Sequence, residues 1–226
     1  SSSGANLVIW EARTLPARLY LARGWKGDFE QAISTLPGKN DPQLFKDRTL
    51  SIFYLEALRQ YLECRRSLQD GDRDTAHKFR VALSETVQRM MGLQNNATRS
   101  SSISEYVRAV TALEVYTAEA RGLVALAGDR TERMIARDWF KTAAEKQQRP
   151  SLLMPPVVVS PMEARLADFF SQTGVLPRAA ETYQAALRRR PNDLAVLQGY
   201  RQALLQLGRK QAADDIAKTI AAVRKP

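Results

Sequence analysis

Segments with helical patterns of apolar and polar residues alternate along the chain with short turns centred on glycine. Five such turns are KGDFEQA at 26–32, DGDRDTA at 70–76, AGDRTER at 127–133, TGVLPRA at 173–179 and LGRKQAA at 207–213. In each turn the glycine is predicted to end one helix in the left-handed conformation. Asp28, Asp72 and Asp129 follow the glycine in the first three turns and are predicted to cap the next helix. Each turn therefore indicates a helical hairpin.

A small residue follows the glycine at a fixed distance in four of the five turns. Ala32, Ala76, Ala179 and Ala213 each lie five residues after it. A small side chain at this position lets the backbones of two helices approach closely. The third turn has Arg133 there instead, so we expect the closest approach in that hairpin to lie elsewhere.

The helical patterns and their boundary residues predict about ten or eleven helices and no strand, and so an all-α fold. Residues 1–148 are predicted to form hairpins, two of them long, at 43–92 and 103–148. Residues 149–160 cannot be helical, because prolines remove backbone donors and restrict the residues that precede them. The Leu, Met and Val residues of this segment favour burial, so we expect it to be extended against the helices. Residues 161–226 are predicted to form two shorter hairpins.

The last two hairpins have the features of a sequence repeat. The same interval of 34 residues separates Gly174 from Gly208, Ala179 from Ala213, Leu166 from Tyr200 and Phe170 from Leu204. The unit at 160–193 resembles the tetratricopeptide repeat, a helix-turn-helix unit of this length. The resemblance rests on Leu166, Ala167, Phe170, Gly174, Ala179, Tyr183, Ala186 and Pro191.

The resemblance is weaker outside this unit. At 194–226 it is partial, since Arg201 replaces the usual small residue and Ala217 the usual aromatic one. The upstream glycines are separated by 44, 57 and 46 residues, so residues 1–148 are predicted to be degenerate units. The segment EARGLVALAGD at 119–129, the helix after it and MPPVVVSP at 154–161 also resemble the carboxyl-terminal part of many bacterial tetratricopeptide proteins.

The resemblance implies a superhelical solenoid in which the first helix of each unit lines a concave face that holds a partner, usually a peptide or another protein. The inward-facing positions of the last two units would include Asp168, Ser171, Gln172, Gln198, Gln202, Leu205 and Gln206. Gln198, Gln202 and Gln206 would form a ladder along one side of a helix. We therefore expect a non-catalytic scaffold that binds a protein or peptide partner of unknown identity. The alternative for these glutamines is a solvated face without a binding role.

The charge distribution adds an alternative function. The chain has 34 Lys and Arg against 24 Asp and Glu, and from Leu176 onward ten basic residues stand against four acidic ones. A regulatory or anchoring domain could bind nucleic acid or an acidic membrane through such an end. However, Arg188, Arg189 and Arg190 end a helix, where cations suit the helix dipole, and no aromatic residues alternate with the basic ones. The sequence therefore favours a solvated face for these basic residues, with an acidic protein partner as the next alternative, ahead of nucleic acid or membrane.

The sequence offers few residues for catalysis or metal binding. Its one histidine, His77, excludes a site with two imidazoles, and its one cysteine, Cys64, excludes a cysteine-rich zinc site. Both residues flank the turn at Gly71 on opposite arms, so they are candidates for a nucleophile pair. A buried cysteine near a surface histidine is the more common arrangement. We expect no enzymatic activity, no metal and no cofactor.

The sequence says little about the compartment. The longest apolar stretch, at 152–159, is far shorter than the roughly 20 residues of a membrane span. No initiator Met or signal peptide is present, so any targeting segment would lie upstream. We expect a fragment of a bacterial protein, cytoplasmic or periplasmic with the periplasm favoured, which acts as a monomer or weak homodimer.

Overall fold

A computed structural model describes residues 3–38, 49–93, 103–147 and 156–224 of the chain. These residues form ten α-helices and no strand, which confirms the all-α prediction and the predicted number of helices. The helices are α1 (Ser3–Arg23), α2 (Asp28–Thr35), α4 (Thr49–Gln69), α5 (Arg73–Gly92), α7 (Ile103–Leu126), α8 (Arg130–Lys146), α9 (Met162–Gln172), α10 (Leu176–Arg189), α11 (Leu194–Gln206) and α12 (Lys210–Val223).

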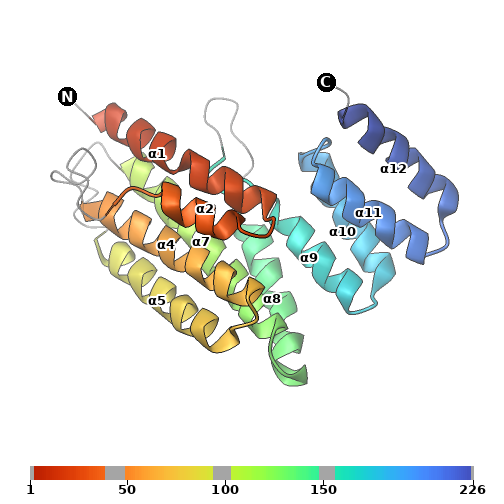
Figure 1. Cartoon of the computed structure of the whole chain (residues 1–226), viewed down its shortest axis with the longest axis horizontal. Coiled ribbons are helices and arrows are strands. Elements are labelled where there is room, and N and C mark those ends of the chain that lie inside the picture. The colour runs from red at the N-terminus through yellow and green to blue at the C-terminus, as the bar shows by residue number, and fades with distance from the viewer. Residues whose placement is uncertain (1–2, 39–48, 94–102, 148–155, 225–226) are drawn as a thin grey trace.

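The helices pair in sequence order into five hairpins: α1 with α2, α4 with α5, α7 with α8, α9 with α10, and α11 with α12. In Figure 1 the first two hairpins lie one below the other on the left, with α7 behind them, and α8 to α12 follow towards the right. The first helix of a hairpin packs on the hairpin before it, since α7 contacts α4 and α5, and α11 contacts α9 and α10. Each hairpin therefore buries apolar surface against its neighbours in the chain.

Four of the five predicted turns have a glycine in the left-handed conformation. Gly71, Gly174 and Gly208 follow a helix end with φ of 79°, 77° and 72°, a region that favours glycine. Gly27 has φ of 85°, but it precedes α2 as its N-cap and does not end α1. The prediction is wrong for Gly128, which has no positive φ. That turn is instead held by a capping box at the start of α8, in which Asp129 and Glu132 bond each other's backbone N–H groups. Side-chain capping thus replaces the left-handed glycine.

The predicted caps are also only partly correct. Asp72 caps α5 by accepting a hydrogen bond from the backbone N–H of Thr75. Asp28 does not cap α2, because it is the first residue of that helix and Gly27 precedes it as the N-cap. The Asp28 carboxylate instead accepts hydrogen bonds from Arg23 and from the backbone N–H of Trp25, both at 2.8 Å. It therefore ties α2 to the end of α1.

The small residues lie where paired helices meet. Ala32, Ala76, Ala179 and Ala213 are fully buried, as close approach requires. In the third hairpin, where Arg133 is exposed, the close approach is made by Gly122 of α7. A Cβ added to Gly122 would lie 2.7 Å from the ring of Phe140 on α8. The expectation of a different contact point in this hairpin is therefore confirmed.

The buried side chains form two clusters. One spans the hairpins from α1 to α7 and includes Val157, Val158 and Met162. The other joins the carboxyl-terminal end of α7 and the middle of α8 to α9, α10 and α11, and contains Phe140, Phe169, Phe170 and Tyr183. The carboxyl-terminal hairpins therefore have a core of their own, which extends onto the third hairpin.

Residues 156–160, the described part of the proline-rich segment, are not helical and lie against the helices. Val157 and Val158 are 5% and 7% exposed. Two helical side chains and two C-cap side chains donate hydrogen bonds to the carbonyls of the segment: Arg18 to Pro156 and Val157, Tyr116 to Val157, Gln147 to Val158 and Ser160, and Arg190 to Val158. These backbone carbonyls thus have hydrogen-bond donors although the segment has no secondary structure. Residues 149–155 lie outside the described residues.

Candidate functional site

Three of the predicted binding residues form a row on α11. Gln198, Gln202 and Gln206 are exposed and lie four residues apart, so they share one side of the helix. None of their carboxamides has a hydrogen-bond partner within the described residues. Leu205, also a predicted binding residue, is half-buried on the same helix. The row therefore presents N–H donors and carbonyl acceptors to whatever approaches this side of α11. We call these three residues the glutamine row.

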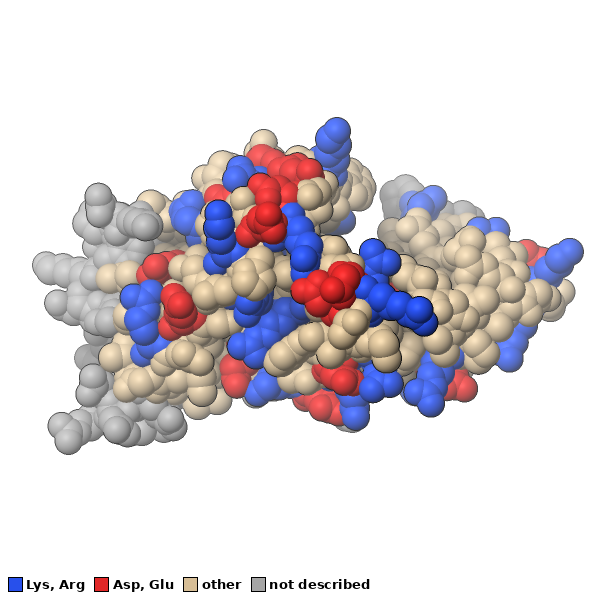
Figure 2. Space-filling model, turned by 90° about the horizontal axis from the view of Figure 1, so that it is seen from below, with Lys and Arg blue, Asp and Glu red and all other residues tan. Residues whose placement is uncertain are grey.

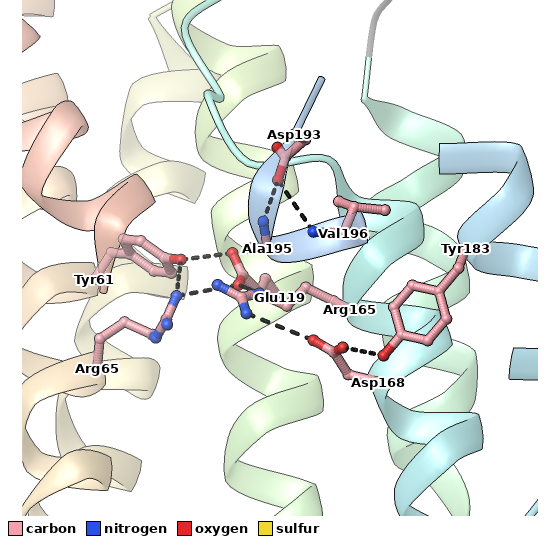
Figure 3. A network of polar contacts seen from close by, with 9 residues as sticks. All are labelled: Tyr61, Arg65, Glu119, Arg165, Asp168, Tyr183, Asp193, Ala195 and Val196. Atoms are coloured by element: carbon pink, nitrogen blue, oxygen red, sulfur yellow. Dashed lines mark hydrogen bonds and ion pairs between the residues drawn. The ribbon is translucent and has the colours of Figure 1, made fainter. Parts of the chain in front are cut away.

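The other predicted binding residues lie on α9, which contacts α11. Gln172 is exposed and Ser171 is half-buried at the carboxyl-terminal end of α9. The Asp168 side chain is 40% exposed, but its carboxylate accepts a hydrogen bond from the Tyr183 hydroxyl at 2.6 Å and lies 3.8 Å from the guanidinium of Arg165 (Figure 3). Burial raises the pKa of Asp168, and the hydrogen bond from Tyr183 opposes that rise. Asp168 thus supports the packing of α9 on α10.

The position of α11 depends on a close contact with Tyr183. A Cβ added to Gly199 would lie 2.7 Å from Cε1, Cζ and Oη of Tyr183. The ring of Tyr183 is 3% exposed and fills the space that glycine leaves. Because Gly199 follows Gln198 directly, this contact places the glutamine row relative to α9 and α10.

A buried carboxylate links three hairpins near this surface. Glu119 of α7 is 1% exposed. It accepts a hydrogen bond from the Tyr61 hydroxyl of α4 at 2.5 Å, from Arg65 of α4 at 3.1 Å and from Arg165 of α9 at 2.8 Å (Figure 3). Arg165 also reaches Asp168, so the network continues to Tyr183 on α10. Sequence reasoning did not identify these residues as a cluster.

The network keeps its charged groups ionised. Burial alone disfavours the Glu119 carboxylate, but the charges of Arg65 and Arg165 and the hydrogen bond from Tyr61 outweigh burial, so the pKa of Glu119 is lowered from its usual value. Burial, together with the charge of Glu119, raises the pKa of Tyr61. An acid-base catalyst needs a pKa close to the working pH. The shifts move the pKa values of Glu119 and Tyr61 further from neutral pH, which suits a structural link between hairpins.

Cys64 and His77 do not have the features of a nucleophile pair. Cys64 is fully buried, and burial raises the pKa of its thiol to about 12. His77 is exposed, and its Nε2 lies 2.7 Å from Nη2 of Arg80. The thiolate is the reactive form of cysteine, and this environment disfavours it.

The basic residues of the carboxyl-terminal end are partly engaged within the fold. Arg189 forms an ion pair with Glu163, and Lys218 forms one with Asp215 at 2.9 Å. Arg190 donates to the Val158 carbonyl at 3.1 Å. On the face seen in Figure 2, basic side chains are spread along the molecule with acidic ones among them. The ion pairs with Glu163 and Asp215 thus neutralise part of the charge of the carboxyl-terminal end.

The described residues contain no group of three or more His, Cys, Asp and Glu side chains that could hold a metal ion. Within the same ranges, no helix combines the length and apolar character needed to cross a bilayer.

Comparisons of the chain with protein-family models, with curated proteins and with solved structures found no match. The functional argument therefore rests on the geometry of this chain.

Proposed function

We propose that the chain is a non-catalytic helical-repeat scaffold of the tetratricopeptide type, which binds a segment of a partner protein along α11 and the end of α9. The stacking of consecutive hairpins and the repeat spacing at 160–193 support the repeat assignment. The glutamine row is the observation that carries the binding role, because its three carboxamides are exposed, aligned and without partners in the described part of the chain.

The chemistry of the row suits the main chain of a partner segment. A carboxamide both donates and accepts hydrogen bonds, as a peptide group does, so a row of them complements an exposed backbone edge or a polar helix face. Leu205 on α11 adds an apolar contact next to the row. Gln172 on α9 extends the polar surface to the neighbouring helix.

The experiment is a paired affinity capture with the native full-length protein as bait. Wild-type bait is compared with the variant Gln198→Ala, Gln202→Ala and Gln206→Ala, and captured proteins are quantified by mass spectrometry. The control variant carries Gln184→Ala and Gln211→Ala, which remove exposed glutamines from α10 and α12. The proposal expects a partner that the row variant loses and the control variant retains. A capture profile that is the same for all three baits contradicts it.

A further inference from the structure

A groove lies between α5, α7 and α8, on helices that carry none of the predicted binding residues. Its volume is ≈180 Å³. Its lining includes Ser84 and Met91 of α5, Thr117 and Arg121 of α7, and Trp139 and Thr142 of α8. Pockets for drug-sized ligands and cofactors measure about 300–1,000 Å³. This groove therefore has the size to hold a side chain or two of a peptide.

One end of the groove is positively charged. The guanidinium of Arg121 stacks over the ring of Trp139, with its Cζ 4.6 Å from the ring centroid, and its Nη2 lies 3.4 Å from the Ser84 hydroxyl. The Nε atom of Arg121 is buried and has no hydrogen-bond partner in the described ranges. Arg80 lies one turn before Ser84 on α5, so it is on the same side of that helix as the hydroxyl that Arg121 contacts. Burial and the charge of Arg121 lower the pKa of Arg80. Neither of them pairs with a carboxylate of the described residues.

The other end of the groove is neutral, and its rim is apolar. Glu114 of α7 pairs with Lys146 of α8 at 2.8 Å, so their charges cancel. Met91, which lines the groove, is 44% exposed. The groove thus offers apolar surface beside two like charges that no carboxylate of the described chain neutralises. A ligand that fits it has a carboxylate next to an apolar side chain.

We propose that this groove binds an acidic segment of a partner protein, with an Asp or Glu carboxylate against Arg121 and Arg80 and a neighbouring apolar side chain between Met91 and Trp139. Guanidinium groups match the planar carboxylate and hold it with paired hydrogen bonds. The ring of Trp139 orients Arg121 and gives the apolar side chain a surface to pack on. This site is separate from the glutamine row, so either can fail without the other.

The test uses the ¹⁵N-labelled full chain and two capped peptides, acetyl-Gly-Glu-Leu-Glu-Phe-Gly-amide and its counterpart with Gln in place of Glu. The indole N–H resonance of Trp139, assigned by its loss in Trp139→Phe, reports binding. The acidic peptide should shift this resonance to saturation, and the glutamine peptide should bind at least about tenfold more weakly, as expected for the loss of a charge-assisted hydrogen bond. Absence of a saturable shift, or equal affinity of the two peptides, overturns the proposal. So does an equal affinity for acetate or inorganic phosphate alone, which would assign the groove to small anions.

Matched variants separate specific pairing from overall charge. Arg121→Gln and Arg80→Gln should each lower the affinity for the acidic peptide by about tenfold. Arg121→Gln could also change the affinity by releasing the Trp139 ring that stacks on Arg121, so Arg80→Gln tests the charge requirement independently of that ring. The control Arg137→Gln removes the same charge from an exposed position of α8 outside the groove and should change the affinity less than about twofold. An equal loss in the Arg137 variant would show that net charge attracts the peptide and would overturn the proposal. The glutamine-row variant should bind the acidic peptide as wild type does.

Discussion

Gly199→Ala tests how α11 is positioned. Alanine in place of glycine inside a helix is normally stabilising, by about 0.8–1.0 kcal/mol. Here the added methyl group would lie 2.7 Å from three atoms of Tyr183, well inside the contact distance of about 3.5–4.0 Å. Tyr183 is 3% exposed and its hydroxyl is bonded to Asp168, so the ring cannot move aside without breaking that bond.

The steric cost should exceed the helix-propensity gain. Overpacking a closed site costs about 1–3 kcal/mol, and separating Tyr183 from Asp168 adds about 1–3 kcal/mol for a buried polar group left unpaired. After the propensity gain is subtracted, we expect the free energy of unfolding to fall by about 1–3 kcal/mol, because part of the strain is relieved by small shifts. For a chain of this length, that corresponds to a melting temperature lower by about 2–10 °C.

Urea and thermal unfolding, followed by far-ultraviolet circular dichroism, measure this change. Gly92→Ala is the matched control, since Gly92 is the last residue of α5 and an added Cβ would meet nothing within 4 Å. The control should be as stable as wild type or slightly more stable. If Gly199→Ala behaves as the control does, α11 does not press against Tyr183 and the described position of the glutamine row is wrong.

Other predictions concern the core. Glu119→Gln should lower the free energy of unfolding by about 3–5 kcal/mol at neutral pH, because it leaves Arg65 and Arg165 without a buried carboxylate. The pKa of Glu119 is lowered in the folded protein from its unfolded value of 4.5. The stability difference between wild type and Glu119→Gln should therefore shrink as the pH falls from 4.5 through the pKa of Glu119 in the folded protein. Urea unfolding at neutral and acid pH checks this, and a difference that does not shrink on acidification contradicts it. Ala179→Leu should destabilise the fold by about 1–3 kcal/mol through overpacking at a fully buried position, and an unchanged melting temperature would argue against a close crossing of α9 and α10. Cys64, with a pKa raised to about 12 by burial, should react with an aromatic disulfide reagent only as fast as the protein unfolds, and a rapid reaction of the native protein would contradict its burial.

The hairpins were predictable because their signals are local. A glycine, a small residue five positions later and flanking helical patterns are enough to indicate Ala76 and Ala179 as contact points. The burial of Val157 and Val158 followed similarly from apolar side chains beside prolines. The turn at Gly128 shows the limit, since capping by Asp129 and Glu132 holds the turn without a left-handed glycine.

The polar network could not be predicted, because its partners are far apart in the chain. Glu119 bonds to residues 54 and 46 positions away, and no local pattern names them. Glu119 is one of three glutamates in the sequence of α7, and no local pattern distinguishes it from the other two. Asp168 shows a related limit, because its repeat position suggested an inward-facing residue but not that Tyr183 would hold its carboxylate. The groove at Arg121 likewise needs helices from two hairpins to form.

The central claim is that the glutamine row carries recognition. The most direct measurement is the equilibrium affinity of a captured partner for three forms of the full-length protein: wild type, the triple alanine variant of the row, and a charge-reversed variant. The last carries Arg188→Glu, Arg209→Glu and Lys210→Glu, which are exposed basic residues of the carboxyl-terminal end. The row variant should bind the partner with well over about 1 kcal/mol less binding free energy, which is about tenfold or more in affinity. Each lost hydrogen bond contributes about 0.5–1.5 kcal/mol. The charge-reversed variant should mainly bind more slowly and with altered salt dependence. If charge reversal abolishes binding while the row variant binds as wild type does, the basic end carries recognition and the claim is wrong.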